Sequence, residues 1–155
     1  MTTDKTHIKY MAKCLELAKI ALSRNNPPVG AILVCNGEII GKGIESCRST
    51  KDITNHAEIN AIRDTIKNQH EAKISESVMY STHEPCIMCS YVIRHHKIGK
   101  LVYGSSVEYI GGHTSNFKLL ETRHVPKWEV VPEIISGILE VECDLLVEEY
   151  SKLNK

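Results

Sequence analysis

The chain has 155 residues, which suits one domain with a single hydrophobic core that needs no disulfide bond to fold. Its composition, 42% hydrophobic and 25% charged residues, excludes a disordered, collagen-like or coiled-coil protein. The formal net charge at pH 7 is zero. A protein that grips a nucleic-acid backbone usually carries a basic surface, so we expect a small uncharged substrate.

The N-terminal third of the chain predicts a helix followed by a β-hairpin. Apolar residues recur at helical spacing over residues 7–24, and two prolines within residues 25–28 end this pattern. Two short apolar runs, 29–35 and 38–44, then flank the dipeptide Asn36-Gly37. Because a type I′ turn needs positive φ at both central positions, this dipeptide predicts a tight turn between two strands.

The rest of the chain alternates between helical and strand-like patterns. A polar loop over 45–55 is followed by an expected helix over 56–67, a strand over 77–82, a helix over 85–96 and a strand over 100–104. We further expect a short helix near 115–120, a strand over 128–135 and a closing amphipathic helix over 138–153. This alternation predicts an α/β sheet covered by helices, in one domain over residues 1–155.

The cysteines and the N-terminus indicate a reducing compartment. No apolar run approaches the length that spans a bilayer, and no signal peptide is visible, so we expect a cytoplasmic protein without a membrane partner. In that compartment cysteines serve as thiols or metal ligands. The six are Cys14, Cys35, Cys47, Cys86, Cys89 and Cys143.

Two short motifs carry residues suited to metal chemistry, His56-Ala57-Glu58 and Pro85-Cys86-Ile87-Met88-Cys89. Alone, each is weak, because His-x-Glu often lies on a solvated helix face and Cys-x-x-Cys can be a redox pair, half of a structural zinc site or two buried thiols. Each motif is predicted to begin a helix, and such helices begin at the sheet edge where ligands bind. Together they supply one imidazole and two thiolates, the ligand set of a catalytic zinc with an open position for water.

A catalytic reading assigns a role to the glutamate of the first motif. We expect His56, Cys86 and Cys89 to hold one Zn²⁺ per subunit, with a bound water or hydroxide. Glu58 is placed to take a proton from this water and to pass it to a substrate. A non-catalytic zinc module has no use for such a carboxylate, which disfavours that alternative.

At these residues the sequence resembles the cytidine-deaminase-like superfamily, and within it the guanine deaminases and tRNA adenosine deaminases. The resemblance runs from about residue 8 to residue 150. It includes the hairpin over 28–41, the two motif helices over 54–63 and 84–89, and the strand over 97–104. It implies a mixed five-stranded sheet in a three-layer α/β/α sandwich, a zinc-dependent hydrolase acting on C–N bonds of cyclic amidines, and a homodimer.

One position departs from the family pattern. Many members have an asparagine at the end of the second strand that binds the substrate base or sugar, and counting back from His56 places Glu45 there. An ionised carboxylate only accepts hydrogen bonds, so Glu45 suits a base that presents N–H donors, such as guanine. The other expected substrate-binding residues are Asn26, Pro28, Ala57 and His83.

We therefore expect hydrolytic deamination of a free nucleobase or nucleoside, with a guanine-like heterocycle favoured, and release of ammonia. The alternatives are a tRNA wobble adenosine deaminase, a cytosine deaminase and a non-catalytic zinc module. The tail over 148–155 lacks a strongly basic ending, which disfavours tRNA as a partner. Whether His113 and Tyr150 contact substrate stays open at this point.

Overall fold

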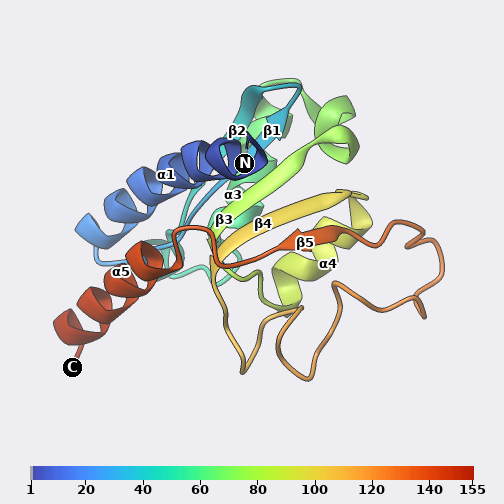
Figure 1. The fold of residues 1–155 in the computed structure, drawn as a ribbon. Coiled ribbons are helices and arrows are strands. Elements are labelled where there is room, and N and C mark those ends of the chain that lie inside the picture. The colour runs from blue at the N-terminus through green and yellow to red at the C-terminus, as the bar shows by residue number, and fades with distance from the viewer. Residues whose placement is uncertain (1) are drawn as a thin grey trace.

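The computed structural model describes residues 2–155 and contains a five-stranded mixed sheet with the order β2-β1-β3-β4-β5 (Figure 1). The strands are β1 (Gly30–Cys35), β2 (Glu38–Ile44), β3 (Val78–His83), β4 (Lys100–Ser105) and β5 (Glu133–Ile135). β1 is antiparallel to β2 and β3, whereas β3, β4 and β5 are parallel. The expected mixed sheet is confirmed, and Asn36 and Gly37 both have positive φ, as the predicted hairpin turn requires.

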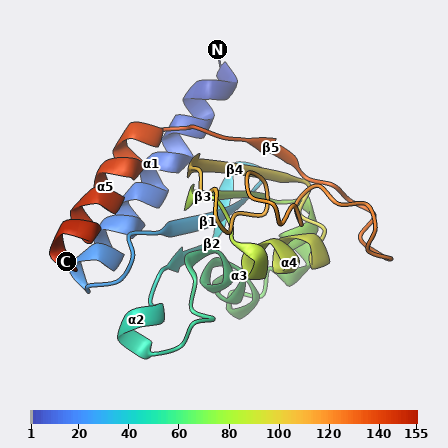
Figure 2. The same cartoon turned by 90° about the horizontal axis from the view of Figure 1, so that it is seen from below.

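Helices cover both faces of the sheet and complete the expected three-layer sandwich. α1 (Thr2–Ser23) and α5 (Glu140–Leu153) lie side by side on one face, and α3 (Ala57–Lys67) and α4 (Ile87–His95) lie on the other (Figures 1 and 2). Two short helices, α2 (Cys47–Thr50) and η1 (Glu71–Glu76), lie in the connections. Within residues 2–155, no helix is both long and apolar enough to cross a bilayer.

Strand residues alternate between two hydrophobic cores. Ile32, Tyr80 and Val102 pack under α1 and α5, while their neighbours Leu33 and Met79 pack under α3 and α4. Successive side chains of a strand point to opposite faces, so each buried strand supplies both layers. This explains why the central strands read as continuous apolar runs in the sequence.

The strand register brings the ends of several strands to one edge of the sheet. Gly30 at the start of β1 pairs with Ile44 at the end of β2. His83 and Ser105, at the ends of β3 and β4, pair with each other, and β1 joins the two halves through its pairing with β3. The segments that leave these ends therefore meet at the same edge, where a ligand site is expected in an α/β sheet.

Two glycines of β2 allow α3 to lie directly on the sheet. A Cβ atom on Gly43 would lie 1.9 Å from the carbonyl oxygen of Ala57. A Cβ atom on Gly41 would lie 2.0 Å from Oγ1 of Thr65, further along the same helix. Side chains at both positions are excluded, so the first turn of α3 is held against the end of β2.

Three expected elements differ from the structure. Residues 115–120 form turns and not a helix, the strand expected over 128–135 is limited to β5, and the expected loop over 45–55 contains α2. The buried Arg94 explains the shorter strand, because its guanidinium binds the carbonyl oxygens of Trp128 and Val130 at 3.3 and 3.0 Å. These carbonyls are engaged by a side chain and do not continue the β4–β5 ladder.

The close approach of α3 to β2 predicts different outcomes for two glycine substitutions. Gly43→Ala should lower the free energy of unfolding by about 1–3 kcal/mol or more, because its methyl group overlaps the backbone of α3. Gly99→Ala is the matched control, since a Cβ atom there meets only Val130 Cγ1 at 3.9 Å. Urea denaturation of both variants measures the difference, and equal stabilities would contradict the close packing.

Candidate zinc and catalytic site

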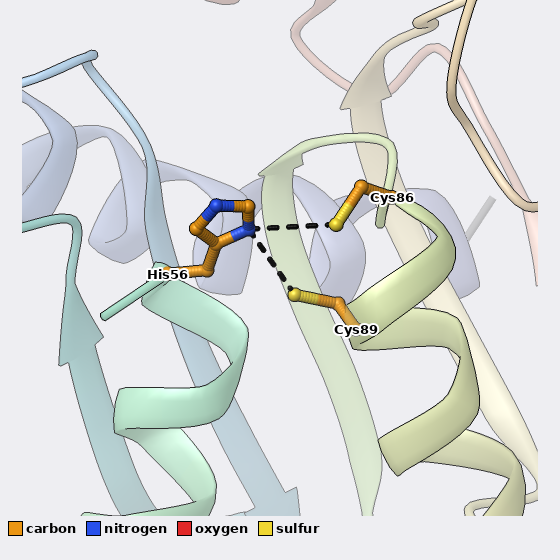
Figure 3. A group of neighbouring side chains, drawn as sticks. All are labelled: His56, Cys86 and Cys89. Atoms are coloured by element: carbon orange, nitrogen blue, oxygen red, sulfur yellow. Dashed lines mark hydrogen bonds between the residues drawn. The ribbon is translucent and has the colours of Figure 1, made fainter. Parts of the chain in front are cut away.

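The two sequence motifs lie at the N-termini of neighbouring helices. His56 is the residue immediately before α3, Cys86 is the residue immediately before α4, and Cys89 lies in the first turn of α4. Figure 3 shows the imidazole of His56 pointing from α3 towards both thiols of α4. The backbone of His56 and of Cys86 is extended, which turns each chain from the sheet edge into its helix.

The ligand atoms of His56, Cys86 and Cys89 have the spacing of a tetrahedral zinc site. His56 Nδ1 lies 3.5 Å from each of the two Sγ atoms, and the three ligand atoms lie within 4.8 Å of one another. Zn–S and Zn–N bonds of about 2.3 and 2.0 Å at a tetrahedral angle place the ligand atoms about 3.6 Å apart. The three side chains therefore fit a zinc ion without rearrangement and leave a fourth position open.

Without the metal, the three groups polarise one another. A hydrogen bond from Cys89 lowers the pKa of the Cys86 thiol to about 4, with a further contribution from His56 and in opposition to burial. The hydrogen bond to Cys86 raises the pKa of His56 to about 9. The pKa of Cys89 is raised by its bond to Cys86 and by burial. The site thus holds a thiolate and an imidazolium before metal binding.

Glu58 lies beside the metal-ligand group with its carboxylate buried. It is 4% exposed, and Ser81 donates a hydrogen bond to Oε1 at 2.9 Å. The Cys89 thiol donates to Oε2 at 3.4 Å. Burial raises the pKa of Glu58, so the carboxyl group can both accept and release a proton. The structure thus brings together all four residues that we expected from the motifs.

A cavity of about 240 Å³ opens at this sheet edge next to the motif residues. Of the residues expected to bind substrate, Glu45 and His83 line it. Glu45 is 5% exposed, burial raises its pKa to about 7, and among residues 2–155 its Oε2 atom has no hydrogen-bond partner. A buried carboxylate oxygen without a partner in a cavity wall is available to a ligand.

The other expected substrate residues lie behind the cavity wall. Asn26 is fully buried, and its side chain binds the backbone N–H and the hydroxyl of Ser49 at 2.9 and 3.0 Å. Pro28 and Ala57 are also buried, whereas Pro27 and Val29 line the cavity. A direct substrate contact by Asn26, Pro28 or Ala57 stays a prediction.

His113 and Tyr150 have partners outside the cavity. His113 Nδ1 lies 2.8 Å from the hydroxyl of Tyr103, and its Nε2 lies 3.5 Å from Glu121. Arg48, in α2, donates a hydrogen bond to the hydroxyl of Tyr150 at 3.2 Å. Tyr150 therefore links the C-terminal helix to the segment that follows Glu45.

The sequence reasoning missed the wall formed by the loop after β4. Val107, Tyr109 and Ile110 line the cavity opposite the hairpin. No periodic pattern marks this loop, so its place could not be inferred from the sequence. A signal was present at Glu84, an acidic residue directly before the second motif, which was noted only as part of the family resemblance.

Glu84 holds this loop in place. It is 1% exposed and accepts four hydrogen bonds, from the backbone of Val107, His113 and Thr114 and from the Thr114 hydroxyl. Burial acts to raise the pKa of Glu84, but these hydrogen bonds outweigh it and lower the pKa. The loop is therefore built around an ionised carboxylate two residues from Cys86.

Comparison with known proteins identifies the family and its relatives. Residues 4–105 match the family described as the cytidine and deoxycytidylate deaminase zinc-binding region. A tRNA-specific adenosine deaminase of Aquifex aeolicus is 36% identical over 93% of both chains, and one of Haemophilus influenzae is 38% identical over 87% of this chain and 77% of its own.

Solved structures of deaminases have a fold similar to that of this chain. A structure from a study of A-to-I editing by tRNA:A34 deaminases at the wobble position is 30% identical, with a TM-score of 0.80 over 89% of this chain and 98% of that one. A guanine deaminase from Bacillus subtilis is 27% identical, with a TM-score of 0.59 over 63% of each chain.

These relatives contradict two expectations from the sequence. The prediction of a free nucleobase or nucleoside as the substrate is wrong. The prediction that tRNA is a disfavoured partner is also wrong. The relatives that match most of the chain are named for action on tRNA. The physical reason is that net charge sums over the whole surface. A neutral total does not describe the few groups around one cavity.

The depressed pKa of Cys86 predicts a selective reaction of its thiolate in metal-free protein. Alkylation of Cys86 by iodoacetamide should be nearly independent of pH from 8 to 6 and should fall only as the pH approaches about 4, where the thiolate takes up a proton. Cys47 is an internal control, because burial raises its pKa and its rate should still climb above pH 8. Mass spectrometry of digests measures both sites. A loss of Cys86 reactivity between pH 8 and pH 6 would contradict the thiolate, and bound zinc should protect Cys86 from alkylation.

Proposed function

The chain belongs to the cytidine and deoxycytidylate deaminase zinc-binding family, and on that basis we propose that it converts adenosine in tRNA to inosine. It is a zinc-binding deaminase, a hydrolase that acts on C–N bonds. One observation carries the choice of substrate. Relatives that are 36–38% identical over 87–93% of this chain are named tRNA-specific adenosine deaminases.

The size of the cavity supports a base that is delivered by a larger molecule. Pockets for drug-sized ligands enclose about 300–1,000 Å³, and this cavity encloses about 240 Å³. A single heterocyclic base fits such a volume. Enzymes that modify bases in nucleic acids turn the target base out of its stack into a pocket of this kind while the backbone stays outside.

The residues around the cavity have defined tasks in this proposal. When bound by His56, Cys86 and Cys89, zinc supplies the activation of a water molecule for attack on C6 of adenine. Glu58 accepts one proton of this water on its carboxylate and transfers it to N1 of the ring. It then takes the second proton from the hydroxyl group formed at C6, so that the C6=O bond forms, and passes it to the amino group, whose C–N bond breaks to release ammonia. Ser81 holds Oε1 of Glu58, which restricts the carboxylate to an orientation beside Cys89.

Glu45 offers a hydrogen-bond acceptor to the base. Its buried Oε2 atom has no partner among residues 2–155, and Glu45 lines the same cavity as His56 and Glu58. An acceptor at Glu45 does not select guanine, because the exocyclic amine of adenine presents N–H donors as well. An acceptor in the wall is therefore compatible with adenosine.

We also propose a homodimer in the cytoplasm. The family resemblance supports the dimer. All six cysteines are unpaired thiols, which supports a reducing compartment.

The proposed substrate can be tested by comparing products with matched candidates. Zinc-loaded protein should release ammonia from an anticodon stem-loop that carries adenosine at the wobble position, and the RNA should then contain inosine. The same stem-loop with guanosine at that position and free guanine, adenine and cytosine should not react. Turnover of a free base without turnover of the stem-loop would reject the proposal.

The role of Glu58 predicts a loss of rate without a loss of the metal site. Glu58→Gln should lower kcat by about 10²–10⁴-fold, because the amide cannot carry the proton. Zinc content and melting temperature should stay close to those of the unmodified protein, since the amide can still accept the hydrogen bond from Ser81. Glu129→Gln, at an exposed position, is the control and should be fully active. A rate above one tenth of the original in Glu58→Gln would contradict the proton transfer.

A further inference from the structure

We propose that Tyr109 is a stacking platform for the nucleotide next to the adenosine that enters the cavity. This inference rests on the proposed function and specifies how the substrate RNA is held outside the cavity. It depends on three observations about the loop after β4: the position of the ring, the rigidity of the loop and the local charge.

The ring of Tyr109 lies at the mouth of the cavity. The residue contributes to the lining, yet 81% of its surface is exposed. The next residue, Ile110, is only partly exposed and also lines the cavity. The two residues therefore mark the boundary between the inside of the cavity and its rim. A base inside the cavity leaves its neighbours in the RNA outside the cavity, at this rim.

The loop that carries Tyr109 is held rigidly against the zinc-ligand helix. Glu84 binds the backbone of Val107 on one side of Tyr109 and of His113 and Thr114 on the other. Gly111 packs directly on this carboxylate, because a Cβ atom there would lie 1.8 Å from Oε2 of Glu84.

Two backbone contacts extend this attachment to the second motif. Gly111 forms an isolated antiparallel bridge with Cys86, and the N–H of Gly112 donates to the carbonyl oxygen of Pro85 at 2.9 Å. The loop backbone on either side of Tyr109 therefore has a fixed position relative to the residues that hold the metal. Preorganisation of this kind lowers the entropic cost of binding.

The local charge favours the face of a base over the phosphate backbone. Glu108, next to Tyr109, is exposed and repels phosphate groups. Unstacked RNA bases bind to aromatic side chains through their faces, and this contact carries no charge. An exposed aromatic ring beside an acidic residue thus suits a nucleobase and disfavours a phosphate contact.

Steady-state kinetics on the stem-loop separates stacking from other roles of Tyr109. A base–aromatic stack contributes about 1–3 kcal/mol, so Tyr109→Ala should raise KM about tenfold or more while kcat stays within about twofold. Tyr109→Phe should keep the original KM, because the ring face is retained, and Tyr109→Leu should resemble Tyr109→Ala. Tyr91→Ala removes an exposed tyrosine that does not line the cavity and should leave KM unchanged.

A spectroscopic measurement reports the stack directly. 2-Aminopurine is placed in the stem-loop on the 5′ or the 3′ side of the target adenosine, and its fluorescence should fall on binding in one of the two positions. The decrease should persist with Tyr109→Phe and disappear with Tyr109→Ala. Equal melting temperatures of the variants establish that the exposed position has no effect on folding.

The outcomes distinguish this inference from the proposed function. If the unmodified protein deaminates the stem-loop and Tyr109→Ala has the original KM, the stacking role is rejected and the function stands. A loss in Tyr109→Phe equal to that in Tyr109→Ala assigns the effect to the hydroxyl group and also rejects stacking. If the unmodified protein does not act on the stem-loop, the proposed function falls and the inference falls with it.

Discussion

The zinc site depends on two helices that start at the same edge of the sheet. His56 and Cys86 each precede a helix, and His56 Nδ1 lies 3.5 Å from the Sγ atoms of Cys86 and Cys89 across the gap between α3 and α4. This spacing requires β1 to lie antiparallel to β3, because only then do the ends of β2, β3 and β4 meet at one edge. It also requires Gly43, since a side chain there would push α3 away from the sheet.

Three buried carboxylates around this edge have different environments and different consequences. Glu84 accepts four hydrogen bonds, which lower its pKa and make it a structural anion within the loop. Glu58 accepts two, from Ser81 and from the Cys89 thiol, and has a raised pKa caused by burial, which suits a group that exchanges protons. Glu45 lines the cavity, has one oxygen without a partner within residues 2–155 and has a pKa raised to about 7 by burial. The hydrogen-bond donors around each carboxylate therefore set its pKa and its role: Glu84 stabilises the loop, Glu58 exchanges protons, and Glu45 lines the cavity.

The error over the substrate has a clear origin. The neutral net charge and the tail after residue 147 describe the chain as a whole, whereas an RNA contact involves the few residues around a cavity mouth. Glu45 was a better guide to the position of the pocket than to its ligand, because a lone acceptor does not discriminate between bases that carry amines. The relatives that match most of the chain are named for action on tRNA, which favours tRNA over a free base.

The sequence by itself determined the parts of this protein that depend on local physics. The Asn36-Gly37 turn, the alternation of strands and helices, and the ligand set of His56, Cys86 and Cys89 follow from turn geometry, periodicity and the chemistry of zinc. Only the tertiary structure decided how the loop after β4 closes the cavity and which of its residues face the mouth. That arrangement depends on hydrogen bonds from Val107 and Thr114 to Glu84 across more than 20 residues of sequence, and contacts of this range leave no periodic pattern in a single chain.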